Sequence, residues 1–226
     1  TEQPVYAYVP LASNDGALVC QYQMTTLEEL GLLKMDFLGL RNLTVLEDAA
    51  RRGRRRVPDF QVERIPLDDK KTFDMLAAGR TVGVFQLESA GITSVCMGLR
   101  PRSIEDITAV IALYRPGPME SIPRFLACSA HPERITYQHP LLEPILSVTY
   151  GCIVYQEQVI EIFRQLAGFS LGQADMIRRA MSKKKEAVIT AERAAFVHGD
   201  PARSIPGAVA NGVPEQTAND IYDEIL

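Results

Sequence analysis

The order of apolar and polar residues divides the chain into a short first part with strand patterns and a longer second part with helical patterns. Apolar side chains cluster in residues 5–9 and 18–23, which flank the turn sequence Asn-Asp-Gly at 14–16, and this arrangement predicts a β-hairpin. A short helix that ends near Gly31 follows. Residues 33–37 then alternate between apolar and charged side chains, which predicts a further strand.

Helical spacing dominates after Pro58. The clearest case is residues 104–113, where four apolar side chains form one face, Ser103 can cap the first turn, and Pro116 follows the last turn. The same criteria predict helices over residues 43–52, 69–78 with Asp68 as the cap, 119–127, 140–146, 155–167, 171–181, 186–197 and 215–226. The phrase at 83–89 is typical of a passage from a strand into a helix.

These patterns predict an α+β fold that is predominantly helical. We expect residues 1–41 to form a small strand-bearing region and residues 42–226 to form an all-helical region.

The composition is that of an ordinary soluble globular protein. Of the 226 residues, 46% are hydrophobic and 23% are charged, which excludes a disordered tail, a collagen-like repeat and a disulfide-stapled miniprotein. The apolar runs are too short to cross a membrane. Because the chain begins without Met and stops inside an apparent helix, we expect it to be a piece of a longer protein.

The four cysteines are scattered and include no CxxC pair, and the three histidines add no paired ligands, so a zinc site is not expected. We expect reduced and mostly buried thiols, which indicates a cytoplasmic location.

The net charge of −4 hides two concentrated basic segments. Residues 51–56 and residues 178–185 each carry +5. A local positive potential can bind phosphate groups even on a chain that is acidic in total. For residues 51–56 we prefer a simpler interpretation, because basic side chains stabilise helix C-termini and a helix is predicted to end there.

Lys34 and Asp36 are the first candidates for chemistry. On a strand they share one face, with backbones roughly 6.5 to 7 Å apart. An acid that holds a divalent cation beside a lysine that neutralises phosphate oxygens would suit a metal–phosphate site. The alternative is an ordinary pair of charged neighbours on a strand surface.

The second candidates are Arg178 and Arg179, which are adjacent on a predicted helix and diverge by about 100°. This divergence predicts that they cannot both hold one phosphate but can serve two neighbouring phosphates, which arginine binds with two parallel hydrogen bonds. Lys183, Lys184 and Lys185 follow as point charges suited to a nucleic-acid backbone. The alternative for the whole segment is a charged, exposed helix face.

Arg115 precedes Pro-Gly-Pro, a rigid turn that could present its guanidinium to a ligand. The alternative, which we prefer, is a capping contact to the preceding helix.

No P-loop, GxGxxG, HExxH or GxSxG motif is present in the sequence.

Five phrases stand in an order seen in one family: GLLKMDFLGLR at 31–41, GVFQLES at 83–89, YRPGP at 114–118, YGCIVYQEQV at 150–159 and RRAMSKKK at 178–185. Together they resemble the C-family replicative DNA polymerases, the family of the bacterial DNA polymerase III alpha subunit. The resemblance covers nearly the whole chain. It implies that residues 1–41 are the last part of the polymerase palm and that residues 42–226 are most of the fingers.

The resemblance also implies roles for individual residues. Asp36 matches the third of three catalytic aspartates that bind two magnesium ions, and Lys34 matches a lysine that contacts the nucleotide triphosphate. Arg178 and Arg179 match an arginine pair that reaches the incoming triphosphate. The other two aspartates belong to an upstream Asp-x-Asp motif that has no counterpart here, so we expect the chain alone to be unable to extend a primer.

The implied activity is template-directed DNA synthesis by two-metal nucleotidyl transfer in the bacterial cytoplasm. Its partners would be primer–template DNA and deoxynucleoside triphosphates (dNTPs), with a sliding clamp and a clamp loader bound through regions outside this chain. Two other classes of function stay open: a non-catalytic nucleic-acid-binding module, and a helical scaffold that contacts replication proteins only.

Overall fold

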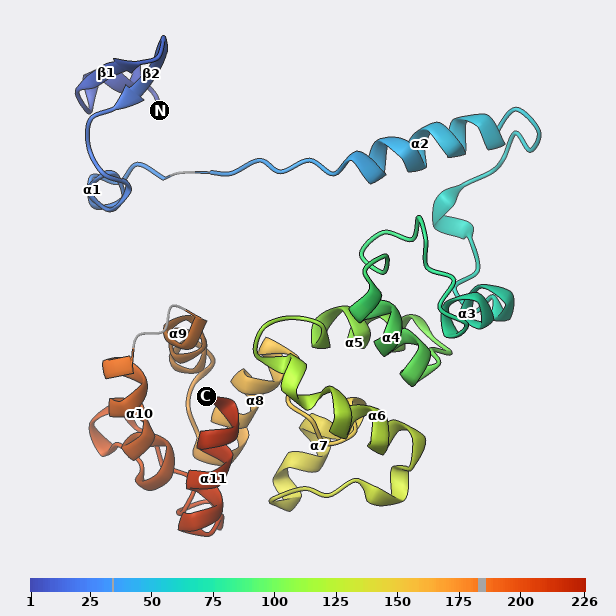
Figure 1. The fold of residues 1–226 in the computed structure, drawn as a ribbon. Helices are drawn as coiled ribbons and strands as arrows, with labels where there is room; N and C mark the ends of the chain where they lie inside the picture. The colour runs from blue at the N-terminus through green and yellow to red at the C-terminus, as the bar shows by residue number, and fades with distance from the viewer. Residues whose placement is uncertain (34, 183–185) are drawn as a thin grey trace. The chain divides into compact units, whose positions relative to one another are not determined.

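The computed structural model describes residues 1–33, 35–182 and 186–226 (Figure 1). The chain forms two compact units, Thr1–Arg64 and Ile65–Leu226, which we call the first and the second unit and describe separately. The first unit holds a small antiparallel sheet, and the second unit is built from helices. The predicted class, a helical protein with a small strand element, is therefore confirmed.

The first unit begins with a β-hairpin made of β1 (Leu11–Asn14) and β2 (Ala17–Cys20). The turn residues Asp15 and Gly16 have φ values of 48° and 82°, the left-handed backbone that a two-residue hairpin turn requires. The predicted hairpin is confirmed, but its first strand was predicted too early. Residues 5–9 instead contain the 3-10 helix η1 (Val5–Ala7), because a two-residue turn pairs the residues directly beside it.

The rest of the first unit contains α1 (Met24–Glu29), α2 (Arg41–Gly53) and the 3-10 helix η2 (Val62–Arg64). The strand predicted at 33–37 is wrong for the residues of that segment that the structure describes, which have no strand pairing and are mostly exposed, Phe37 at 92%. An extended segment becomes a strand only when a neighbour satisfies its backbone groups. In the described ranges, β1 and β2 pair only with each other.

The second unit contains nine α-helices in its described residues: α3 (Lys70–Ala77), α4 (Ala90–Leu99), α5 (Ile104–Leu113), α6 (Ile122–Ala130), α7 (Glu143–Leu146), α8 (Gln156–Ala167), α9 (Leu171–Ser182), α10 (Glu186–His198) and α11 (Glu215–Ile225). Short 3-10 helices lie between them: η3 (Pro118–Ser121), η4 (Pro132–Arg134), η5 (Pro140–Leu142), η6 (Ser147–Thr149) and η7 (Pro201–Arg203). No helix in the described part of the chain has the length and apolar content that a membrane crossing needs.

Most of the predicted helices are present, and their caps follow local chemistry. Ser103 caps α5 as predicted, because its Oγ accepts a hydrogen bond from the backbone N–H of Asp106 at 3.2 Å. The cap of α3 is Asp69 rather than the predicted Asp68, and it accepts from the N–H of Thr72 at 2.9 Å. Residues 83–88 form turns before α4, so the strand half of the predicted strand-to-helix passage is wrong.

Two apolar clusters form most of the core of the second unit. In one, Phe163 of α8 is fully buried, and its ring lies 4.9 Å from that of Phe196 in α10 and 5.8 Å from that of Tyr222 in α11. These ring contacts hold α8, α10 and α11 together (Figure 1). The other cluster joins α3, α4 and α5 through Phe73, Leu76, Val95, Cys96 and Val110.

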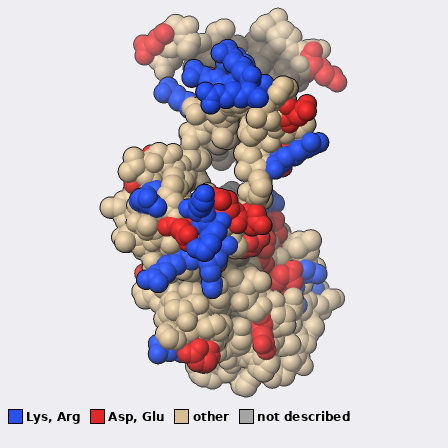
Figure 2. All heavy atoms as spheres, turned by 90° about the vertical axis from the view of Figure 1, so that its right-hand side faces the viewer, with Lys and Arg blue, Asp and Glu red and all other residues tan. Residues whose placement is uncertain are grey.

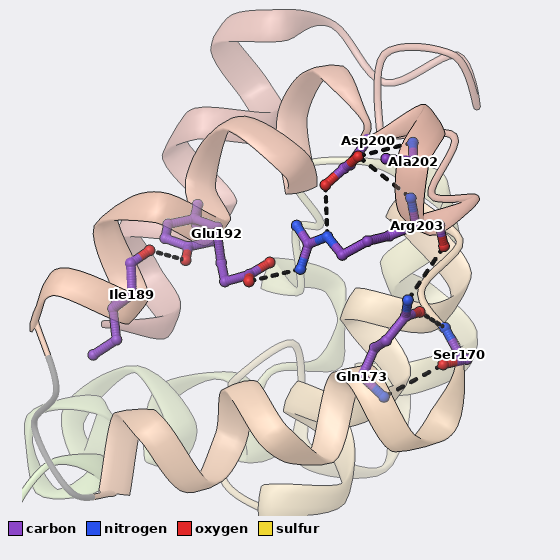
Figure 3. A network of polar contacts seen from close by, with 8 residues as sticks. Ser170, Gln173, Ile189, Glu192, Asp200, Ala202 and Arg203 are labelled. Carbon is purple, nitrogen blue, oxygen red and sulfur yellow. Dashed lines mark hydrogen bonds and ion pairs between the residues drawn. The ribbon is translucent and has the colours of Figure 1, made fainter.

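A polar network fixes the start of α9 (Figure 3). The backbone N–H of Ser170 donates to Gln173 Oε1 at 2.8 Å, and Ser170 Oγ accepts from the N–H of Gln173 at 3.3 Å, a reciprocal capping box. Gln173 Nε2 also donates to the carbonyl of Arg203 at 3.3 Å. The Arg203 guanidinium in turn contacts Glu192 of α10 at 2.7 Å and Asp200 at 2.6 Å. The start of α9 is thus tied to α10 and to the loop that follows it.

All four cysteines are free thiols, as expected. Cys96, Cys128 and Cys152 are buried, and Cys20 is half-buried.

Candidate functional site

The two predicted arginines near the end of α9 share one carboxylate. Arg178 Nε and Nη2 each lie 2.9 Å from Asp175 Oδ1, and Arg179 Nη2 lies 2.8 Å from Asp175 Oδ2. Residues three and four positions apart lie on the same helix face, so the long side chains converge although their backbone directions diverge. The two arginines thus share one carboxylate, whereas the expectation that they serve two neighbouring phosphates rather than one stays a prediction.

Arg178 is held more firmly than Arg179. Its Nη1 donates to Gln156 Oε1 at 2.8 Å, and Gln156 is the first residue of α8. The Arg178 side chain is 22% exposed, whereas that of Arg179 is 68% exposed. The hydrogen bond from Arg178 lowers the pKa of Asp175, so this carboxylate is ionised at neutral pH. The guanidinium of Arg178 is consequently oriented by contacts from two helices.

Gln158 organises the chain just before α8. It is 5% exposed, and its Oε1 accepts from the backbone N–H groups of Val154 and Tyr155, each at 2.9 Å. Its Nε2 donates to the carbonyl of Ile145 at 3.1 Å and to Thr149 Oγ1 at 2.8 Å. The amide therefore uses two acceptor and two donor positions, its full capacity. These bonds fix the backbone that leads into the first turn of α8.

Arg178 and Gln156 line a cleft of about 710 Å³ in the second unit. Its walls come from η3, α6, α8, α9 and α11 and include Glu120, Arg124 and Asp223. Its charged side chains are two bases, Arg124 and Arg178, and three acids, Glu120, Asp223 and Glu224, and Arg124 is paired with Glu224 at 3.2 Å. The cleft combines charged groups with apolar side chains such as Ile153, Val159 and Met181, a mixture found in ligand pockets.

Of the remaining predicted phosphate contacts in the second unit, Arg115 is described by the structure and three lysines are not. Arg115 is exposed in the turn after α5, and its backbone N–H donates to the carbonyl of Leu113 at 2.8 Å. Lys183, Lys184 and Lys185 lie outside the described residues.

The basic segment at 51–56 lies at the C-terminal end of α2, as the preferred interpretation stated. Arg51 is paired with Asp48, and Arg54 lies 3.2 Å from Glu47. Figure 2 shows that Lys and Arg side chains gather in separate clusters on the face drawn, and that Asp and Glu side chains lie beside some of these clusters. Acidic partners on the same helix reduce the positive potential that these arginines can offer to a phosphate.

The predicted metal ligand Asp36 lies in the first unit, in an exposed segment without strand pairing. Lys34 is outside the described residues. In the described ranges, no group of three or more His, Cys, Asp or Glu side chains is arranged to hold a metal ion. The described residues therefore do not fit a two-magnesium site by themselves, which requires several oxygen ligands for each ion.

Sequence reasoning missed Asp175, Gln156 and Gln158. Asp175 could have been found, because a carboxylate three and four residues before two arginines is a recognised helical pairing. Gln156 and Gln158 lie inside the phrase at 150–159 that carries the family resemblance, but their partners are spread over residues 145–178 and no local pattern reveals them.

Two family models match the chain. One is described as the finger domain of the bacterial DNA polymerase III alpha subunit and matches residues 42–203. The other is described as the bacterial DNA polymerase III alpha NTPase domain and matches residues 1–39.

Curated relatives match over the whole chain. The DNA polymerase III subunit alpha of Staphylococcus epidermidis is 48% identical over all 226 residues, and that of Staphylococcus aureus is 46% identical over the same span. The chain covers 20% of the length of each of these relatives.

Proposed function

This chain belongs to the bacterial DNA polymerase III alpha subunit family, and from that premise we propose that the whole protein is a template-directed DNA polymerase of chromosomal replication. Within it, α9 supplies the contact to the triphosphate of the incoming dNTP. The observation that carries this proposal is the guanidinium pair of Arg178 and Arg179, oriented by Asp175 and Gln156, with Arg178 on the wall of a cleft.

The chemistry of the pair suits a triphosphate. Two guanidinium groups and the ionised Asp175 carboxylate give this group of three side chains a net charge of +1. Guanidinium groups meet phosphate oxygens with two parallel hydrogen bonds. When a primer 3′ hydroxyl attacks the α-phosphate and pyrophosphate leaves, negative charge develops on the leaving group, and fixed cations stabilise it.

We assign the remaining predicted roles as part of the same proposal. Asp36 is one carboxylate ligand of the divalent cations, with the other ligands supplied by parts of the protein outside this chain. Lys34 neutralises triphosphate oxygens, and Arg115, Lys183, Lys184 and Lys185 contact DNA or nucleotide phosphates. Because one carboxylate cannot complete the coordination of two magnesium ions, the chain alone does not extend a primer.

The test replaces each arginine in the full-length polymerase and varies dNTP and DNA concentrations separately. A charge-assisted contact to phosphate stabilises by about 1.5 to 3 kcal/mol, so Arg178→Ala and Arg179→Ala should each lower kcat/KM for dNTP by roughly ten- to a hundredfold. Arg164→Ala is the matched control, because Arg164 is an exposed arginine of α8 that also pairs with an acid three residues earlier. It should stay within about twofold.

Other outcomes would point to the other classes of function. If both variants weakened only DNA affinity and left the dNTP dependence unchanged, the pair would be a DNA-backbone contact. If neither substrate were affected, the scaffold function would be favoured.

A further inference from the structure

The two arginines of α9 have different restraints. Arg179 contacts Asp175, on its own helix, and is largely exposed. Arg178 contacts Asp175 through Nε and Nη2 and also reaches Gln156 on α8 through Nη1. Contacts at all three guanidinium nitrogens, from two directions, define both the position and the plane of the Arg178 guanidinium.

The two partners of Arg178 differ in how they respond to a phosphate. Asp175 is an anion whose oxygens accept the same guanidinium hydrogen bonds as phosphate oxygens, so the carboxylate and a phosphate compete for the guanidinium. Gln156 is neutral and contacts a different nitrogen, so it does not compete. Its hydrogen bond can persist when a phosphate takes the nitrogens that face Asp175.

Gln156 is itself well placed to act as a fixed partner. It follows Tyr155, whose backbone N–H is held by the buried Gln158 at 2.9 Å. The backbone N–H of Gln158 donates in turn to the carbonyl of Tyr155 at 3.1 Å, and Gln156 is the first residue of α8. The acceptor oxygen that Arg178 meets therefore projects from a restrained backbone.

We propose that Gln156 is a positioning residue that keeps the Arg178 guanidinium in the orientation that receives a triphosphate. This inference rests on the proposed function, in which Arg178 binds the nucleotide. The guanidinium ends a long side chain with several rotatable bonds, and a partner that limits its rotation before binding removes part of the ordering cost. Loss of Gln156 should therefore weaken nucleotide use without removing any group that touches the nucleotide.

The experiment uses Gln156→Met in the full-length polymerase at saturating primer–template DNA. Methionine keeps the length of the side chain and removes the acceptor oxygen. Gln165→Met is the matched control, because Gln165 is also an exposed glutamine of α8 with one side-chain hydrogen bond, to Glu161 at 3.0 Å. We expect kcat/KM for dNTP to fall about three- to tenfold in Gln156→Met, mainly through KM, and to change less than twofold in Gln165→Met.

Double variants separate positioning from a general effect on the helix. If Gln156 acts through Arg178, adding Gln156→Met to Arg178→Ala should cause no further loss, whereas adding it to Arg179→Ala should cause nearly its full effect. Thermal midpoints of the single variants should match that of the unmodified protein.

Three results would overturn the inference: a Gln156→Met effect no larger than that of Gln165→Met, a full additional loss on the Arg178→Ala background, or a lowered thermal midpoint that accounts for the loss. If Arg178→Ala itself leaves the dNTP dependence unchanged, the proposed function fails and this inference fails with it. The dNTP dependence of Arg178→Ala alone distinguishes this failure from a failure of the positioning role of Gln156.

Discussion

Replacing Gln158 by Met removes the buried side-chain amide that organises the entrance to α8, and we expect this change to destabilise the second unit by about 2 kcal/mol or more. Methionine has nearly the same length, so the substitution tests the hydrogen bonds rather than the volume. Gln158 is suited to such a test because it is 5% exposed and makes four hydrogen bonds.

The magnitude follows from the groups that lose their partner. Without Oε1, the backbone N–H groups of Val154 and Tyr155 have no acceptor, and an unsatisfied buried donor costs about 1 to 3 kcal/mol. The bond of the Val154 N–H is buried and that of the Tyr155 N–H is part-buried, so the two donors together give about 2 to 4 kcal/mol. Thr149 adds less, because its hydroxyl also donates to the carbonyl of Cys152 at 2.6 Å.

The assay is urea or thermal unfolding of the chain followed by circular dichroism. A loss of 2 kcal/mol corresponds to a decrease in Tm of about 4 to 8 °C for a unit of this size. Amide hydrogen exchange adds a local readout, because the N–H groups of Val154 and Tyr155 should lose protection first. Gln165→Met serves again as the control and should change stability by no more than about 0.5 kcal/mol.

A Gln158→Met cost below about 0.5 kcal/mol, or unchanged exchange at Val154 and Tyr155, would refute this reasoning. It would mean that the two N–H groups find other acceptors and that Gln158 does not hold the start of α8.

Two further predictions concern the backbone and the thiols. Gly199→Ala should lower the stability by more than about 2 kcal/mol, because φ is +90° and a Cβ would lie 2.4 Å from the carbonyl oxygen of Pro206. Gly212→Ala, where φ is +87° and the space is open, should lower the stability by about 1 kcal/mol. Equal losses in unfolding experiments would contradict the steric argument. Burial raises the pKa of Cys152 to about 11, so at pH 8 the folded chain should resist alkylation at Cys152 while the half-buried Cys20 reacts. The reactivity of Cys152 should increase as the pH rises toward 11. Rapid labelling of Cys152 at pH 8, detected by mass spectrometry, would disprove the burial.

Local signals in the sequence predicted the elements that local chemistry controls. The cap at Ser103 and the helical spacing after it predict α5 with its observed bounds, because a helix satisfies its backbone within one segment. The hairpin turn is likewise evident from Asp15 and Gly16, which accept a left-handed backbone. The ordered phrases along the chain identified the family, which the matches over residues 1–39 and 42–203 confirm.

Predictions that needed a distant partner were less successful. Residues 33–37 alternate like a strand, but strand formation depends on a neighbour, and in the described residues the alternation alone does not produce one. Asp36 and the pair Arg178 and Arg179 could be singled out from the sequence, and their roles stay proposals.

The amino-acid sequence by itself determined the helices, the hairpin turn and the presence of two adjacent arginines near the end of α9. Only the tertiary structure decided how those arginines are held. Gln156 and Arg178 are 22 residues apart, and they meet because α8 and α9 pack against each other. The sequence pattern reports which side chains a segment carries and which face they share, whereas the partner of a long side chain depends on the packing of helices in space.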